Sequence, residues 1–109
     1  MSALLGTTRT AAADSTLSVS PECFNWGGGV AACSPYVTGG TGNYVSYYWQ
    51  FTDSYPGKTT YNYSWTETDP WMEHNCRVGG TVTVTLTVTD SQGETGTGTH
   101  SIRCRQWPD

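Results

Sequence analysis

The sequence is poor in charged residues, and basic residues are the scarcer kind. Only 13% of its 109 residues are charged, with five Lys and Arg against nine Asp and Glu, which gives a formal net charge of −4. No window contains a run of Lys or Arg, so the chain lacks the positive surface with which proteins bind nucleic acid or anionic lipid. We therefore expect no nucleic-acid partner.

Long apolar runs are also missing. No stretch approaches the roughly 18 apolar residues that cross a bilayer, so we expect no membrane insertion. Near the start, only Ala3-Leu4-Leu5 is apolar, and Arg9 falls where the hydrophobic part of an export signal would continue. We expect no intact export signal. A trimmed signal is the alternative, because Ala11-Ala12-Ala13 before Asp14 resembles the end of a cleavage site.

Residues that usually carry catalysis or metal binding are few. The two histidines, His74 and His100, are not accompanied by a Gly-x-Ser-x-Gly motif, so a nucleophile with a histidine base is not indicated. Asp53, Asp69 and Asp90 fall in predicted loops and are weak candidates for calcium, but they form no Asp-x-Asp-x-Asp run. We expect a protein that is not an enzyme and that binds no cofactor.

What is abundant points to β-structure. Thr, Ser and Gly are frequent, and seven Tyr and five Trp suit pleated surfaces joined by tight turns. The chain length fits one domain. Several short strands without a helical segment indicate an all-β sandwich or a small barrel over residues 16–109. Residues 1–15 are small, polar and aperiodic, and we interpret them as an N-terminal arm or linker.

The clearest strand signal is a hairpin near the end of the chain. Four apolar residues alternate with threonines, which indicates one buried and one solvated face: Val82, Val84, Leu86 and Val88. Asp90-Ser91-Gln92-Gly93 then predicts a turn, with Asp90 bonding the backbone ahead and Gly93 taking a positive φ. The return strand, 95–105, should place Ile102 and Cys104 on one face.

Weaker signals divide the first two thirds of the chain. In the strand predicted for 44–51, Tyr47, Trp49 and Phe51 share one face. A strand over 59–66 places Tyr61, Tyr63 and Trp65 together. The other expected segments are a short edge strand that Pro21 ends, a strand over 30–37 that Pro35 interrupts, and an irregular connection over 68–80.

Three segments together resemble one family. They are Gly39-Gly40-Thr41-Gly42-Asn43-Tyr44, Tyr47-x-Trp49-x-Phe51 and the run from Thr81 to Gly93, and they resemble the PKD-type repeat and related bacterial immunoglobulin-like domains over about residues 39–104. The resemblance implies an immunoglobulin-like antiparallel β-sandwich of about seven strands. It also implies that the tryptophan strand and the last hairpin face each other across the core, with Trp49 under Val84 and Leu86.

The sequence has four cysteines but no Cys-x-x-Cys pair. They are Cys23, Cys33, Cys76 and Cys104. An even number in a short polar chain predicts two disulfides and an oxidising compartment. On the topology that the resemblance implies, we prefer Cys23–Cys33 with Cys76–Cys104. The pairing Cys33–Cys76 with Cys23–Cys104 is also geometrically allowed.

The sequence has more aromatic residues than one small core needs. Those expected in or near loops could stack on sugar rings or anchor a protein interface, or they could cover the ends of the core. These candidate ligand contacts are Trp26, Tyr36, Tyr48, Tyr55, Trp71 and Trp107.

Two functions follow as hypotheses, both extracellular and non-enzymatic. The first is a structural or decoration module of an assembly, such as a phage virion surface or tail, because virions are released by lysis without an export signal. Residues 1–15 would then contact a neighbouring subunit. The alternative is a secreted accessory module that recognises polysaccharide or a cell-surface protein, or that inhibits an enzyme. The expected partners are thus protein neighbours or carbohydrate.

Overall fold

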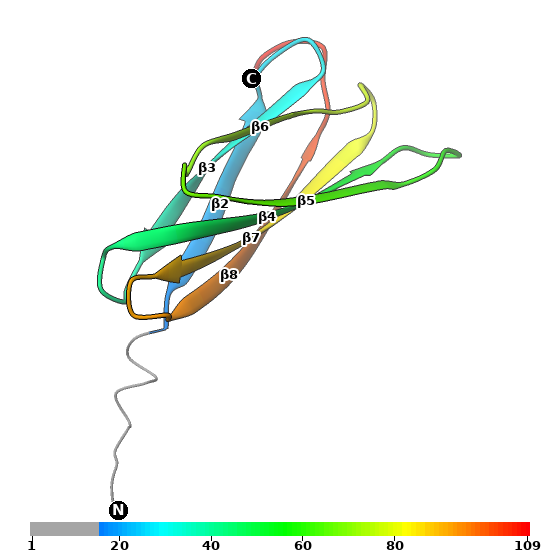
Figure 1. Cartoon of the computed structure of the whole chain (residues 1–109). Helices are drawn as coiled ribbons and strands as arrows, with labels where there is room; N and C mark the ends of the chain where they lie inside the picture. The colour runs from blue at the N-terminus through cyan, green and yellow to red at the C-terminus, as the bar shows by residue number, and fades with distance from the viewer. Residues whose placement is uncertain (1–15) are drawn as a thin grey trace, which may run out of the picture.

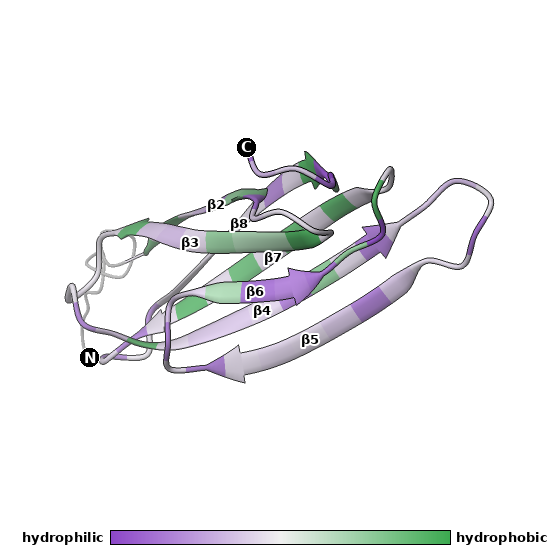
Figure 2. Cartoon of the chain, turned by 90° about the horizontal axis from the view of Figure 1, so that it is seen from above, coloured by the Kyte–Doolittle hydropathy of each residue, from purple (hydrophilic) through white to green (hydrophobic). Residues whose placement is uncertain are grey.

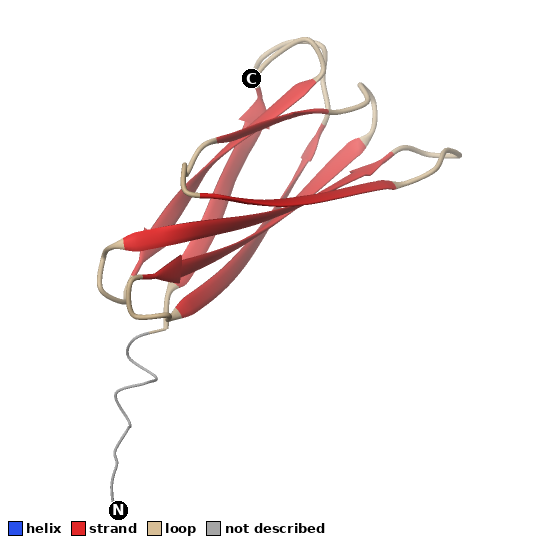
Figure 3. Ribbon diagram, viewed as in Figure 1, coloured by secondary structure: helices blue, strands red, loops and turns tan. Residues whose placement is uncertain are grey.

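The computed structural model describes residues 16–109, which form seven β-strands and no helix (Figure 3). The predicted arm, residues 1–15, lies outside the described residues, so its contact with a neighbour stays a prediction. None of the described residues belongs to a helix that could cross a membrane. The strands are β2 (Ser18–Asn25), β3 (Val30–Thr38), β4 (Tyr44–Ser54), β5 (Tyr61–Glu67), β6 (Met72–Asn75), β7 (Thr81–Asp90) and β8 (Thr95–Arg103).

The strands form two antiparallel sheets that pack as a β-sandwich, as predicted (Figure 1). One sheet has the order β2-β3-β6 and the other β5-β4-β7-β8. The expectation that the tryptophan strand faces the last hairpin across the core is wrong, because β4 pairs directly with β7 in one sheet. Trp49 lies opposite Leu86, and Phe51 opposite Val84. This ladder keeps both apolar rows on the same inner face.

The core consists of these inward rows and a smaller contribution from the second sheet. Trp49, Phe51, Leu86 and the three β7 valines are 0% exposed, and Ile102 packs against them partly buried. The other sheet adds small or flexible side chains, namely Cys23, Ala31, Cys33 and Met72. Figure 2 shows the alternation of apolar and polar positions along β7. The predicted core is therefore confirmed.

Both prolines that were expected to end or interrupt strands lie inside them. Pro21 and Pro35 are opposite each other in the β2–β3 ladder. Two residues further on, Cys23 lies opposite Cys33 with a Cα–Cα distance of 4.0 Å, typical of the close pairs that exchange no backbone hydrogen bonds. Pairs of this kind recur at every second residue, so Pro21 and Pro35 also form one. At such a position an N–H group would not bond to the partner strand, and its absence in proline costs no ladder hydrogen bond.

Strand β6 lies within the segment that was expected to be irregular, 68–80. It is only four residues long and mostly polar, and Met72 is its one fully buried side chain. Its backbone pairs with β3 from Val30 to Cys33. Backbone pairing, rather than an apolar pattern, therefore defines this strand.

Both disulfides follow the preferred pairing. Cys23–Cys33 joins β2 to β3, and Cys76–Cys104 joins the end of β6 to the end of β8, which links the two sheets. Each such bond typically contributes about 2–4 kcal/mol to stability. Two disulfides indicate an oxidising, non-cytoplasmic environment.

The sheets approach most closely where β2 lies against β8. A Cβ on Gly96 would meet the Leu17 carbonyl, and one on Gly98 would meet the Val19 carbonyl. At the next inward position of β8, His100 Nδ1 accepts a hydrogen bond from the Cys23 N–H at 2.9 Å. The inner face of β8 thus needs two residues without a side chain and then an acceptor.

Gly98→Ala tests this close approach. The added methyl group would overlap backbone atoms, so we expect a loss of about 3 kcal/mol or more, the upper end of the usual overpacking cost. Thr99→Ala, one residue away on the exposed outer face, should cost about 1 kcal/mol or less. Urea denaturation measures both. Equal midpoints for Gly98→Ala and the wild type would show that β2 does not lie against β8.

Candidate functional site

Two of the six predicted aromatic contacts come together on the outside of the molecule. Trp26 and Trp71 have ring centroids 5.7 Å apart, and each lies 5.8 Å from Phe24, which sequence reasoning did not select. Trp26 is 54% exposed, and the other two are half-buried. We call Phe24, Trp26 and Trp71 the aromatic patch.

The alternation of β2 explains why the patch faces solvent. Cys23 and Asn25 point inward and are buried, so Phe24 between them points outward. Its cross-strand neighbour Ala32 is 0% exposed although it also faces away from the core, so this part of the outer face is covered. Glu73 follows Ala32 in the same row on β6.

Trp71 is held in place from both sides. Asp69 Oδ1 accepts the backbone N–H of Trp71 at 2.9 Å, which fixes the chain before β6. The indole Nε1–H donates to Glu73 Oε2 at 2.7 Å. Glu73 is exposed and has a second carboxylate oxygen to accept hydrogen bonds from a ligand.

The patch presents aromatic surface at several angles rather than as one flat platform. Its rings are inclined to one another by 59° to 73°. Such edge-to-face packing is a favoured aromatic geometry and stabilises the cluster itself. A ligand can still contact the exposed part of Trp26 while it donates hydrogen bonds to Glu73. The arrangement suits a ligand with both an apolar face and hydroxyl groups.

The other four predicted aromatic contacts lie apart from the patch. Tyr36 on β3 is 62% exposed, and Tyr48 on the outer face of β4 is 38% exposed. Tyr55 follows β4 and lies beside the Arg77 guanidinium. Trp107 is 76% exposed and forms no ring pair with the patch, but its C-terminal segment lies beside Trp26, since the N–H of Gly28 donates to the Gln106 carbonyl at 2.7 Å.

A second aromatic group, which sequence reasoning missed, lies on the open side between β5 and β6. The His74 ring is 4.4 Å from Tyr63, 4.6 Å from Phe51 and 5.6 Å from Trp65, which is stacked on it. The shared face of Tyr63 and Trp65 was predicted, but their histidine neighbour was not. Tyr63 is 40% exposed, so it belongs only partly to the core.

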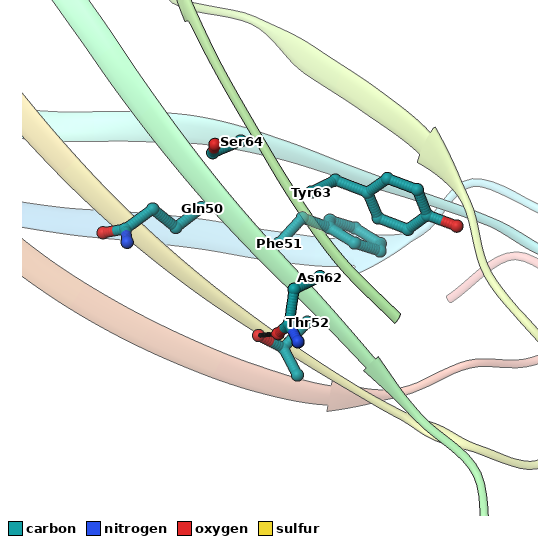
Figure 4. Close-up of a pocket in the computed structure, with 6 residues that line it drawn as sticks. All are labelled: Gln50, Phe51, Thr52, Asn62, Tyr63 and Ser64. Carbon is teal, nitrogen blue, oxygen red and sulfur yellow. Dashed lines mark hydrogen bonds between the residues drawn. The ribbon is translucent and has the colours of Figure 1, made fainter. Parts of the chain in front are cut away.

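A shallow hollow at β4 and β5 is lined by four uncharged polar residues and by the aromatic residues Phe51 and Tyr63 (Figure 4). Gln50, Asn62 and Ser64 contribute to it, and Thr52 Oγ1 donates to Asn62 Oδ1 at 2.9 Å. This lining contains no carboxylate, imidazole or cationic side chain. It therefore offers hydrogen-bonding groups to a ligand.

The three aspartates that sequence analysis considered for calcium each have a structural partner. Asp53 is 3% exposed and accepts from Arg77 Nε at 3.3 Å, and Asp69 holds the Trp71 backbone. Asp90 accepts three backbone N–H groups. Over residues 16–109, no three His, Cys, Asp or Glu side chains come close enough to hold a metal ion.

Asp90 fixes two loops at one end of the sandwich. Its Oδ1 accepts the N–H groups of Gln92 and Glu94, which confirms the predicted turn, and its Oδ2 accepts the N–H of Thr41 in the β3–β4 loop. Burial alone would raise the pKa of Asp90. The backbone donors outweigh burial and hold the pKa below its ordinary value.

The lowered pKa of Asp90 predicts loss of stability in acid. Its contribution is fully present above the ordinary Asp pKa of about 4 and is lost as the pH falls through the lower value of the folded state. Asp90→Asn should lower the urea midpoint at pH 7, because an amide cannot accept all three N–H groups. The difference between the wild type and this variant should shrink below about pH 4. A difference that is constant from pH 7 to pH 2 would contradict this role.

Comparison with known proteins leaves the fold without a family assignment. No family model matches this chain, and no curated protein or solved structure matches it. No relative therefore supports membership of the PKD-type family.

Proposed function

We propose that this chain is a non-enzymatic, extracellular binding module of PKD-like type that recognises neutral polysaccharide through the aromatic patch. The observation that carries the proposal is the cluster of Phe24, Trp26 and Trp71 on an outer sheet face, beside the carboxylate of Glu73. The two disulfides support an extracellular location, because such bonds persist in oxidising compartments.

The patch is organised before any ligand binds. Asp69 and Glu73 hold Trp71, and the two other rings pack against its indole. A rigid aromatic surface loses little conformational entropy on binding, so more of the contact energy appears as affinity. Tryptophans in such positions commonly dominate the energy of an interface.

The chemistry of the patch favours a sugar. The C–H groups on one face of a pyranose ring carry partial positive charge and pack on the negative face of an indole. Sugar hydroxyls can donate to the Glu73 carboxylate. A carboxylate next to the rings and a net charge of −4 both disfavour an anionic ligand, which is why we propose a neutral chain.

A second candidate function is a structural module of an extracellular assembly. One observation favours it: β5 is an edge strand that pairs with β4 on one side, and no described strand pairs with its other edge. Such an edge can accept a strand from a neighbouring chain.

Affinity electrophoresis in gels that contain hydroxyethyl cellulose, glycol chitin or dextran tests the proposed function. We expect at least one of these polymers to retard the wild type. Trp26→Ala and Trp71→Ala should each weaken that binding about tenfold or more, as expected for hot-spot residues. Tyr48→Ala is the matched control, since it removes an exposed aromatic side chain from the other sheet.

Two results would overturn this assignment. One is unchanged retardation of the Trp26 and Trp71 variants, and the other is loss of retardation in Tyr48→Ala alone. If no polymer retards the wild type while both patch variants lose thermal stability, the patch serves only to cover the sheet.

A further inference from the structure

The free edge of β5 lacks the features that usually protect edge strands. Its sequence, YNYSWTE, contains no Lys, Arg or Pro, and its register with β4 is continuous over seven residues without a bulge. Charged side chains, prolines and bulges are the common means of preventing edge-to-edge pairing. Figure 2 shows β5 at the border of the four-stranded sheet. Such an edge offers backbone hydrogen-bonding groups to another strand.

We propose that β5 pairs antiparallel with β5 of a second copy of this chain, about a two-fold axis at Ser64. The inference deepens the second candidate function, assembly, and does not depend on polysaccharide binding. A symmetric dimer needs a surface that is complementary to itself. In this arrangement the two four-stranded sheets would join into one continuous sheet.

The side chains of β5 are self-complementary in that register. Ser64 lies opposite its own copy, and centring the axis there uses all seven residues of the strand. Tyr63 then lies opposite Trp65, twice per dimer, which gives aromatic cross-strand pairs. Each residue lies opposite one that faces the same side of the sheet, so aromatic side chains stay on the inner face and polar ones on the outer face.

Charge and exposure favour the same pairing. Glu67 is the only ionised side chain on β5, and its partner would be Tyr61, whose hydroxyl can donate to a carboxylate. No like charges meet. Tyr61 and Tyr63 are 45% and 40% exposed, so pairing would cover aromatic surface that the single chain leaves in water.

Cross-linking of the full chain tests the register. In an antiparallel pair, opposite Cα atoms lie about 4.5–5.5 Å apart, within the range of a disulfide. Ser64→Cys should therefore form a covalent dimer under oxidised glutathione, seen on non-reducing gels and by intact mass. Ser101→Cys is the matched control, on the same outer face but on the opposite edge strand β8, and should stay monomeric. Equal cross-linking of the two variants would overturn the proposal.

Sedimentation equilibrium tests the interface without a new thiol. The wild type should dimerise reversibly, and Ser64→Lys should raise the dissociation constant at least tenfold because two ammonium groups would meet at the axis. Ser101→Lys, on the same outer face but on the opposite edge strand β8, should leave the constant unchanged. A wild type that stays monomeric at millimolar concentration would overturn the proposal.

Sedimentation equilibrium of Ser64→Lys also distinguishes the β5 interface from the assembly function on which it rests. If Ser64→Lys dimerises like the wild type, assembly uses another surface, and the β5 interface is wrong while the assembly function stands. Retardation by polysaccharide should be the same for Ser64→Lys and the wild type, because Ser64 lies on the other sheet from the aromatic patch.

Discussion

The ladder between β4 and β7 is the constraint on which the rest of the structure depends. Ten residues of β4 find partners on β7, and every inward side chain along the middle of that ladder is fully buried. The Trp49 indole N–H has no hydrogen-bond partner within residues 16–109, which is unusual for a buried tryptophan. Burial of its ring therefore outweighs the cost of an unpaired donor. On the outer face, hydroxyl pairs such as Thr87–Thr97 join β7 to β8 and complete a polar surface.

The second sheet is held by a different kind of contact, and this frees its outer face. Its inner side chains are mostly small, and it is fixed by the close approach of β2 to β8 and by the disulfide Cys76–Cys104. Because backbone contacts and a covalent bond hold β2 and β6, the aromatic residues of these elements are not needed inside. Phe24 on β2 and Trp71, which directly precedes β6, therefore lie on the outside of the molecule, where we propose that they bind a ligand. The disulfides stabilise the fold and also indicate the compartment in which the surface would act.

Strands with strict alternation of apolar and polar residues could be predicted from the sequence. Prediction failed for segments whose structure depends on a partner distant in the chain. Alternation along β7 and β4 identified the core, and the Asp90 turn followed from local backbone chemistry. The prolines of β2 and β3 could not be placed, because only their mutual pairing makes them acceptable. Strand β6 has too few apolar residues to show a pattern. The contact of Trp26 with Trp71 depends on how β2 packs beside the chain before β6, so the sequence indicated surplus aromatics but not which of them meet.

The five tryptophans allow a direct test of the claim that the aromatic patch binds the ligand. Each indole N–H gives its own signal in a two-dimensional ¹H–¹⁵N NMR spectrum, and the five lie in different surroundings. Titration with a soluble oligosaccharide of the polymer that retards the protein should shift the signals of Trp26 and Trp71. The signals of Trp49, which is buried in the core, and of Trp65, which lies on the other sheet, should stay unchanged. Shifts confined to Trp65, with Trp26 and Trp71 unaffected, would contradict binding at the aromatic patch.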